Sequence, residues 1–507
     1  MPQFDYEKFR LRRFLDRLVQ AGEVEIHNEP VSLGDLAALI EGTPKATWFK
    51  DVGPEHFEMA AGIMASRKRL AMALDTNKRD LVHEYMRRLA TPQEVVEVPS
   101  RDAPVQQVVI KGDDIDLAKL PFYLQHELDG ATYISAAMDF TIDPKNGKPN
   151  VGFRRLMLKG KRTMRANLTQ ISDLKRIYLE AVERKEPLPV SFVIGAHPLV
   201  CLGAAIRLPV NEFELVAQLR GETMPMVKSL TNNVLVPADA ELVIEGYFDE
   251  RGHAEIEGPY GELYGLYGPM HPDPLFHVTA ITHRRDVLHH TLLHGGQFLS
   301  RNDAAHMSGL DAEAKAWRAL EEAGIAVMAV HAPPSGVGFH HIRAAIKQRQ
   351  PGDGRLAVET LLKMPRYKHI FVVDDDIDVF SDSEVERAMC TRFRVGKDLI
   401  VESGHRTLTM DPTGDHGQQS VAGFDMTRDL NEPDDLERWP SFSPTLKAVR
   451  SVSSVRGALE TGPKFFRDIM ENLGTKDGRA IAVELGTLQD QGVVGRKPNG
   501  EWFLEKA

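Results

Sequence analysis

Two glutamates, Glu257 and Glu262, stand five residues apart around a Gly-Pro-Tyr-Gly turn. Proline fixes its own φ angle and glycine tolerates tight or left-handed backbone, so this turn can be rigid. A rigid turn can direct both carboxylates to one point, and acid–base enzymes need carboxylates that are held in this way. The alternative is a polar surface turn, because glutamates are usually exposed. The rest of the chain must decide between these interpretations.

Two other groups of side chains have the spacing of metal ligands. His290 and His294 are four residues apart, as zinc ligands on a helix are, but the local pattern favours a strand that leads into a loop. The Asp-x-Asp-x-Asp run that begins at Asp374 starts like a calcium-binding loop and lacks its glycine and its distal glutamate. A capped turn after a strand is therefore the better interpretation of this run.

Composition narrows the class of protein. The 507 residues, 42% hydrophobic and 27% charged, are typical of a soluble globular protein of several domains. A net charge of −11 argues against a general nucleic-acid or anionic-membrane binder. The two cysteines, Cys201 and Cys390, form no redox motif, so a cytoplasmic protein without disulfides is expected. We find no signal peptide, no apolar run near ~18 residues, no phosphate-binding glycine loop and no serine-hydrolase elbow.

Periodicity predicts the elements that must position the two glutamates. An amphipathic helix at 7–22 and a strand at 24–26 open a mixed α/β region. From about 105 to 310 strands separated by turn clusters predominate, with one helix near 211–219, which predicts a β-rich domain and a candidate barrel. The clearest of these strands are expected at 108–110, 133–142, 190–194 and 276–282.

After residue 311 helices and strands alternate, as in an α/β domain. Helices are expected at 312–323, about 342–348, 356–363 and 384–392, and strands at 327–331 and 369–373. Residues after about 401 look rich in loops, with a last helix at 463–473.

Ordered motifs along the chain resemble the UbiD family of prenylated-flavin-dependent (de)carboxylases. They are an arginine-rich first helix that ends in Gly22-Glu23, the 116–135 segment (DLAKLPFYLQHELDGATYIS), Asn150 to Arg155 (NVGFRR), Leu219-Arg-Gly, 236–246 (VPADAELVIEG), Glu257 to Glu262 (EGPYGE) and 372–392 (VVDDDIDVFSDSEVERAMCTR). Their common order over roughly residues 7 to 415 makes the resemblance specific.

The resemblance implies a multidomain α+β or α/β fold. We expect an N-terminal α/β region at 1–104, a central flavin-reductase-like split β-barrel that binds prenylated FMN at 105–310, a linker helix at 311–325, an α/β oligomerisation domain at 326–460, and a C-terminal helix and tail at 461–507. The family also implies a homodimer or homohexamer, and a flavin prenyltransferase as the supplier of the cofactor.

The implied reaction is the non-oxidative, reversible decarboxylation of an aromatic or heteroaromatic acid to release CO2. Such a reaction needs a cofactor as electron sink, while the protein orients the substrate and delivers a proton. By motif position, Arg155, Glu257 and Glu262 form the catalytic network. Arg155 holds the carboxylate and pairs with Glu257, and Glu262 protonates the carbon that CO2 leaves.

Cofactor and metal residues are also implied by motif positions. The expected cofactor contacts are Ser135, Asn150, Phe153, Arg154, Arg155, Arg165, Ala166, Asn167, Gln170, Glu212 and Arg406. The expected metal ligands, for Mn²⁺ with K⁺ as a further candidate, are Asn150, Glu212 and Thr169. The chain departs from the family where a ligand histidine is expected, since Thr169 or Gln170 stands there. It departs again where Thr407 replaces a lysine, and Arg406 can supply that charge.

The substrate is less defined than the reaction. His294 and Gln297 are candidate contacts in a loop that differs from the family's usual one, and their polarity would suit a heteroaromatic or hydroxylated ring. One alternative substrate is a bulkier acid such as an aromatic acyl-CoA. A second alternative is a non-catalytic carrier of prenylated flavin or an assembly subunit, which the presence of Arg155, Glu257 and Glu262 argues against.

Overall fold

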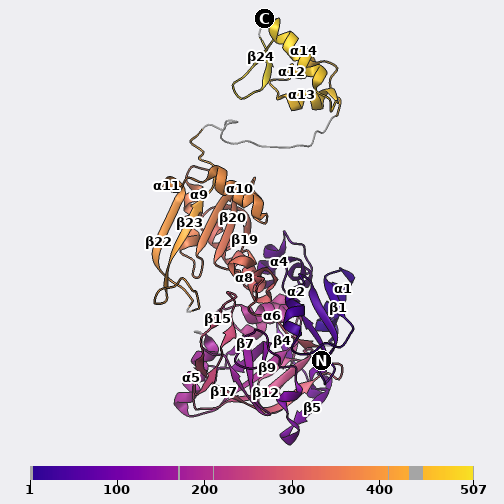
Figure 1. The fold of residues 1–507 in the computed structure, drawn as a ribbon, viewed down its shortest axis with the longest axis vertical. Helices are drawn as coiled ribbons and strands as arrows, with labels where there is room; N and C mark the ends of the chain where they lie inside the picture. Colours follow the sequence, from indigo (N-terminus) through magenta and orange to yellow (C-terminus); the bar gives the residue numbers. More distant parts are fainter. Residues whose placement is uncertain (1–3, 170–171, 209, 409, 433–448, 506–507) are drawn as a thin grey trace. The chain divides into compact units, whose positions relative to one another are not determined.

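A computed structural model describes residues 4–169, 172–208, 210–408, 410–432 and 449–505. The chain forms two compact units, residues 1–428 and 429–507 (Figure 1). Both cysteines are free, as expected. Within the described ranges we find no helix of the length and apolar character that crossing a bilayer requires.

The N-terminal region is a four-stranded sheet with helices, and one of its strands comes from far along the chain. The sheet order is β1-β2-β3-β18. Its members are β1 (Val24–His27), β2 (Ala46–Val52), β3 (Phe57–Ala61) and β18 (His289–His290), and the helices are α1 (Leu11–Gln20), α2 (Leu36–Gly42), α3 (Arg67–Ala73) and α4 (Leu81–Leu89). The predicted first helix and strand are therefore confirmed. Helix α1 buries Leu11, Phe14, Leu15 and Leu18, the apolar stripe that its sequence pattern predicts.

The centre of the first unit is a closed barrel of six antiparallel strands. The order β12-β9-β6-β7-β8-β17 closes because β12 also pairs with β17, and β5 (Val108–Lys111) adds to β17 outside the ring. The barrel strands are β6 (Tyr133–Ile142), β7 (Pro149–Gly160), β8 (Thr163–Ala166), β9 (Leu188–Ile194), β12 (Leu242–Phe248) and β17 (Leu275–His283), and α5 (Asp173–Arg184) joins β8 to β9. The expected barrel is confirmed.

Strand alternation fills this barrel with large side chains. In β9, Leu188, Val190, Phe192 and Ile194 belong to one apolar cluster, while Val193 packs into a different one. This is the period-2 division of a strand with two buried faces. Phe192, Phe248 and Phe276 meet edge to face inside the barrel, with ring centroids 4.8–6.1 Å apart. The inside of the barrel is thus a packed core, and a binding site must lie elsewhere.

Two helices and a small sheet pack beside the barrel. They are α6 (Pro198–Ala205), α7 (Glu212–Arg220), β4 (Val95–Glu97), β10 (Met224–Lys228) and β11 (Leu235–Pro237), the strands in the order β11-β10-β4. Helix α7 confirms the helix predicted near 211–219. The Asn211 side chain caps it by accepting from Phe213 N–H, and Gly221 ends it with φ +75°. These caps fix which residue opens the helix, and that residue is Glu212.

The next part of the first unit is a five-stranded mixed sheet in the order β19-β20-β21-β23-β22. Its strands are β19 (Ala326–His331), β20 (His341–Lys347), β21 (His369–Asp374), β22 (Leu399–Arg406) and β23 (Gln418–Asp425), and the helices are α8 (Asp303–Glu322), α9 (Asp353–Leu362), α10 (Asp382–Arg392) and α11 (Val395–Asp398). The helix expected at 342–348 is wrong: this segment is strand β20, which β19 and β21 flank on both sides. The loops expected after 401 are wrong in part, because β22 and β23 lie there.

The second unit has its own core. It contains α12 (Val455–Leu459), α13 (Phe466–Leu473), α14 (Arg479–Asp490) and the hairpin of β24 (Val494–Arg496) and β25 (Trp502–Leu504). Val455, Leu459, Ile469, Leu485 and Val494 are buried together. The expected last helix is confirmed as α13, whereas α14 and the hairpin were not predicted.

Closure of the barrel depends on a glycine in β12. A Cβ at Gly246 would overlap the backbone oxygen of His277 in β17, next to the β-bulge between these strands. We expect Gly246→Ala to lower the free energy of unfolding of the first unit by about 1–3 kcal/mol, measured from urea denaturation midpoints. Gly396→Ala is the control, because a Cβ there meets no atom within 4 Å. Equal midpoints for the two variants would contradict the expectation.

Candidate active site

Two short hairpins hold the glutamate turn. Glu257 ends β13 (Glu255–Glu257), which pairs with β16 (His271–Asp273), and Glu262 comes directly after β14 (Tyr260–Gly261), which pairs with β15 (Tyr267–Gly268). Gly258 has φ +87° and precedes a cis proline. A Cβ at Gly261 would overlap the imidazole of His126. Backbone geometry that only glycine tolerates well therefore brings both carboxylates to one place, and neither is exposed.

Arg155, on barrel strand β7, binds both glutamates. Its Nε and Nη2 donate to the two oxygens of Glu257 at 2.8 and 2.9 Å, and its Nη1 donates to Glu262 Oε1 at 2.5 Å. The guanidinium carbon lies 4.5 Å from the centre of the Tyr260 ring. Burial lowers the pKa of Arg155, but its hydrogen bonds and the charges of Glu257 and Glu262 outweigh burial and raise it overall. Arg155 is therefore a permanent cation between two acids.

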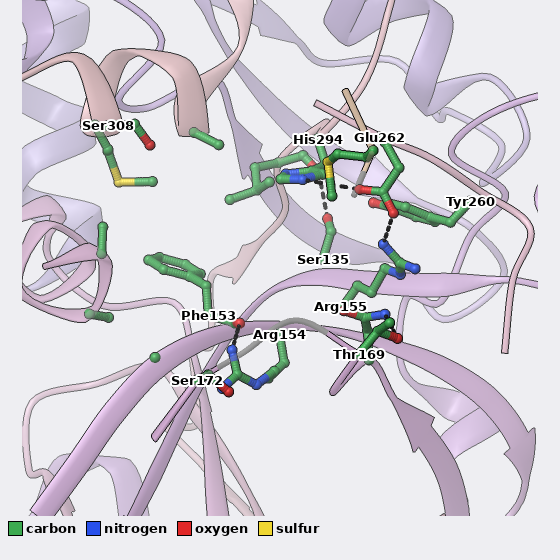
Figure 2. A pocket seen from close by; sticks show the side chains of 18 of the residues that line it. Ser135, Phe153, Arg154, Arg155, Thr169, Ser172, Tyr260, Glu262, His294 and Ser308 are labelled. Carbon is green, nitrogen blue, oxygen red and sulfur yellow. Dashed lines mark hydrogen bonds and ion pairs between the residues drawn. The ribbon is translucent and has the colours of Figure 1, made fainter. Parts of the chain in front are cut away.

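A cavity of about 510 Å³ opens beside this network. Figure 2 shows Arg155, Tyr260, Glu262 and His294 gathered on one side of it, with Phe153 and Ser308 across from them. Of the sequence-predicted residues, the lining includes Ser135, Asn150, Phe153, Arg154, Arg155, Asn167, Thr169, Glu212, Glu262 and His294. Its size lies within the range of ~300–1,000 Å³ that is usual for ligand sites. The structure thus brings most of the predicted site together.

His294 stands against the second glutamate. Its Nε2 lies 3.7 Å from Glu262 Oε2. Burial lowers the pKa of His294, although the charge of Glu262 opposes this effect, so a neutral imidazole is favoured near pH 7. His290 is in β18 and outside this cavity lining, so the two histidines do not share a helix. The strand-to-loop interpretation of this segment is confirmed.

Buried oxygen donors line another part of the wall. Asn150 donates to Asp139 Oδ2 at 3.0 Å, and a carboxylate oxygen of Glu212 accepts from Val151 N–H. Burial raises the pKa of Glu212 to about 7, and the carboxylates of Asp139 and Asp173 add to this effect. Because a bound cation would favour ionised Glu212 and oxygen donors suit hard cations, these residues fit a metal site. The Thr169 hydroxyl instead lies 2.9 Å from His271 Nδ1.

Several predicted contacts do not reach the cavity lining. Ala166 is buried in the barrel cluster, and Arg165 lies beside Met157 and Glu255. Gln297 is exposed, with its backbone N–H bound by Glu41, and Arg406 is exposed on β22. Gln170 lies outside the described residues. The Asp374 run is the expected turn after a strand, in which Arg392 pairs with Asp374 and Asp376.

Sequence reasoning missed three ionisable residues of the cavity lining: Arg207, His271 and Asp173. Arg207 lines the cavity near Arg154; burial lowers the pKa of Arg207, and Arg366 and Arg154 add to this effect. His271 lines it from β16; burial lowers the pKa of His271, but its hydrogen bond to Asp273 more than compensates. For Arg207, the only available signal in the sequence was the presence of a single arginine in the apolar segment 204–208. The β13–β16 pairing that places His271 leaves no periodic signal in three-residue strands.

Family models match almost the whole first unit. They are the 3-octaprenyl-4-hydroxybenzoate carboxy-lyase N-terminal domain at residues 15–89, its Rift-related domain at 96–297 and its C-terminal domain at 305–426. The described elements after residue 449 lie outside these matches. Among curated proteins, the anhydromevalonate phosphate decarboxylase of Methanosarcina mazei is 30% identical over 431 residues, which cover 84% of this chain and 98% of that protein.

Solved structures agree with this assignment. The UbiD-class enzyme HmfF from Pelotomaculum thermopropionicum, in complex with FMN, is 30% identical with a TM-score of 0.80, covering 85% of this chain and 97% of its own. The vanillic acid decarboxylase of Sedimentibacter hydroxybenzoicus, in open form, is 27% identical with a TM-score of 0.77, covering 89% and 98%. With three ordered domain matches, a central six-stranded barrel and relatives matched over nearly their full length, the chain belongs to the UbiD family of decarboxylases.

Proposed function

We propose that this carboxy-lyase uses prenylated FMN for the reversible, non-oxidative decarboxylation of an aromatic or heteroaromatic acid in the 510 Å³ cavity. The observation that carries the proposal is the bridge that Arg155 forms between the buried carboxylates of Glu257 and Glu262 at the cavity wall. An isolated ion pair on a surface would need neither burial nor a cavity. This arrangement instead has the pre-positioned charges of an acid–base site.

The cavity fits a flavin phosphate as well as an acid substrate. Arg154 and Arg207 supply positive charge in the lining, and Phe153, Asn167 and Ser135 supply apolar and hydrogen-bonding surface. HmfF, a relative of this chain, was solved with FMN, and an evolved dimeric form of it with prenylated FMN. When bound, the cofactor would supply the sink for the electron pair that stays on the substrate carbon as CO2 leaves.

A cation fits beside the phosphate end of the cavity. Asn150 and Glu212 would be its protein ligands, and Mn²⁺ or K⁺ suits their oxygen donors. Its positive charge would hold Glu212 ionised and assist phosphate binding. Thr169 is the weaker candidate ligand, since its hydroxyl is already bound to His271.

Arg155 orients the substrate. A guanidinium has five N–H donors, and Glu257 and Glu262 occupy three of them in the free protein. The other donors can bind the substrate carboxylate without releasing Glu257. Bidentate or paired binding of this kind fixes the direction of the bond that breaks.

Glu262 delivers the proton. One of its oxygens binds Arg155, and the other faces neutral His294 across 3.7 Å. After CO2 leaves, a proton on Glu262 moves to the carbon that carried the carboxylate, and the resulting charge on Glu262 is stabilised by Arg155. In the reverse direction Glu262 accepts that proton. His294 contacts the substrate from the same side, whereas exposed Gln297 is the poorer candidate.

A second substrate class has its own support. The relative from Methanosarcina mazei is named for a phosphorylated acid that is not aromatic, so a phosphorylated α,β-unsaturated acid is our second candidate. An acyl-CoA is less favoured, because a flavin and a small acid already account for a cavity of this size. A flavin prenyltransferase as partner and a homodimer or homohexamer complete the proposal.

Loading with cofactor tests the proposed function directly. The full chain, co-expressed with a flavin prenyltransferase, is expected to copurify with a flavin that shows in the absorbance spectrum, and to release CO2 from at least one acid of a panel. The panel contains aromatic, heteroaromatic and phosphorylated unsaturated acids, and protein expressed without the prenyltransferase is the control. Absence of bound flavin would refute the proposal; turnover only of a phosphorylated acid would select the second class.

Removal of the proton donor separates chemistry from binding. Glu262→Gln keeps the shape and an acceptor for Arg155 but has no proton to give. We expect kcat to fall by about 10²–10⁴-fold, with flavin content unchanged. Glu214→Gln, an exposed position on α7, is the control. A Glu262→Gln enzyme with full kcat would show that another group delivers the proton.

Measurement of bound metal tests whether Asn150 and Glu212 form a cation site. Glu212→Gln removes the negative charge that draws a cation, and we expect bound Mn²⁺ to fall by about tenfold or more at a fixed free concentration. Atomic emission after gel filtration measures it. Glu214→Gln, two residues away on the same helix, should keep its metal; equal loss in both variants, or none in Glu212→Gln, would contradict this assignment.

A further inference from the structure

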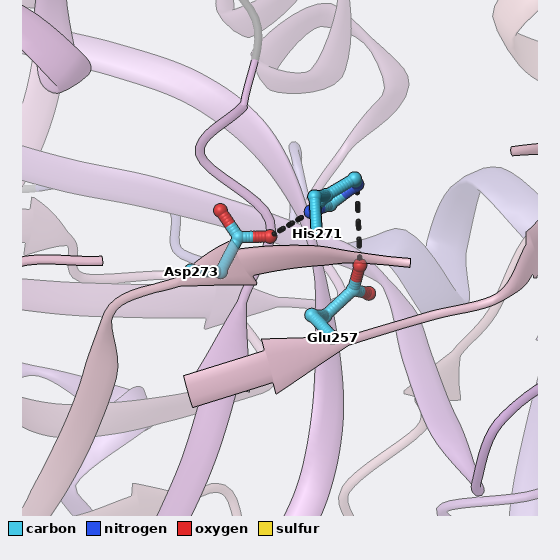
Figure 3. A group of neighbouring side chains, drawn as sticks. All are labelled: Glu257, His271 and Asp273. Atoms are coloured by element: carbon cyan, nitrogen blue, oxygen red, sulfur yellow. Dashed lines mark ion pairs between the residues drawn. The ribbon is translucent and has the colours of Figure 1, made fainter. Parts of the chain in front are cut away.

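Glu257 has a second partner besides Arg155. Strands β13 and β16 pair in a register that sets Glu257 directly opposite His271. The His271 Nε2 atom lies 3.7 Å from Glu257 Oε2, the same oxygen that Arg155 Nη2 binds at 2.9 Å. Figure 3 shows the imidazole between Glu257 and Asp273. Cross-strand neighbours are held by the backbone, so this contact is part of the fold.

The orientation of the His271 ring is fixed from its other side. Its Nδ1 lies 2.8 Å from Asp273 Oδ2 and 2.9 Å from Thr169 Oγ1. Asp273 is fully buried, and its other oxygen accepts from Leu168 N–H at 2.8 Å. A carboxylate that is itself held in this way selects the tautomer and the plane of a histidine. The Nε2 edge of His271 therefore faces Glu257 Oε2 at 3.7 Å, with the side-chain nitrogen of Asn167 at 3.3 Å from the same atom.

This group is better described as an ion-pair chain than as a metal site. Ligand atoms of Glu257, His271 and Asp273 lie within 4.8 Å of one another. However, both oxygens of Glu257 already accept from Arg155, and His271 Nδ1 is bound to Asp273. The contacts run in series from Asp273 through His271, Glu257 and Arg155 to Glu262. Each link limits the rotation of the next.

We propose that His271, oriented by Asp273, is a positioning residue of the decarboxylation site, which holds Glu257 so that Arg155 stays aligned with Glu262 and the substrate carboxylate. The proposal rests on the proposed function. Without His271, Glu257 can turn about its side-chain bonds and carry the guanidinium with it. Small displacements of reacting groups lower the rate strongly while binding persists.

The chain offers a matched pair elsewhere. His277 on β17 binds Asp249 with an Nε2–Oδ2 distance of 2.8 Å, the same kind of contact as His271 with Asp273. His277 is about one third exposed and is not among the residues of the cavity lining. If a loss of kcat merely reflects a broken histidine–aspartate pair, substitution of His271 and substitution of His277 should both cause it.

Steady-state kinetics of the cofactor-loaded full chain tests the proposal. For His271→Ala we expect kcat to fall by about tenfold or more, with KM changed less than about twofold and flavin content unchanged. His271→Gln, whose amide keeps an N–H donor, should recover part of kcat, and His277→Ala should match the parent. Equal kcat in His271→Ala and the parent, or a rise in KM alone, would overturn the positioning role. Should His271→Ala not fold, Asp273→Asn replaces it with the same expectations.

A structural measurement separates this proposal from the proposed function. Crystals of the parent and of His271→Ala, both soaked with FMN, need no substrate. We expect Glu257 to lose at least one of its two contacts with Arg155 in the variant. Intact contacts there would overturn the proposal even in an active enzyme. If the parent turns over no acid, the proposed function fails, and the position of Glu257 still decides the role of His271.

Discussion

One largely enclosed cation, the guanidinium of Arg155 between two buried glutamates, organises the site of this molecule. An isolated buried charge is costly, so the fold must bring compensating carboxylates to it. Glu257 and Glu262 come from a turn about a hundred residues away, and they can meet Arg155 only if the barrel closes and the two small hairpins form. Catalytic geometry and the free energy of folding are therefore coupled at one position.

The cavity has two ends with different sets of charged residues. At one end, Arg155 with two glutamates forms the charged network to which we assign proton transfer and carboxylate binding. At the other end, Arg154 and Arg207 stand among Asp139, Asp173 and Glu212, where charges of both signs suit a phosphate together with a cation. Strand β7 carries Asn150, Phe153, Arg154 and Arg155, so one strand sets the distance between these ends.

Much of the fold and of the site could be predicted from the sequence, for identifiable reasons. Strand β9 is a short apolar run rich in β-branched and aromatic residues, and α7 has an Asn cap and a Gly stop, so local rules sufficed. For segment 342–348 we predicted a helix, because its alanines and isoleucines are compatible with either a helix or a strand. Only its pairing with strands β19 and β21 makes it a strand. Family motifs identified Arg155, Glu257 and Glu262 from the sequence. The exposure of Gln297 could not be predicted in this way. The position of His271 could not be predicted either, because it depends on the pairing of two three-residue strands.

Strand β18 has a wider consequence. It is the fourth strand of the N-terminal sheet, and four residues beyond it the chain places His294 at the cavity. The N-terminal sheet therefore fixes the start of the loop that carries His294. The N-terminal region cannot be exchanged as an independent domain. A homologue's N-terminal segment grafted onto this chain would have to accept a foreign strand in register. By contrast, the second unit encloses a hydrophobic core of its own.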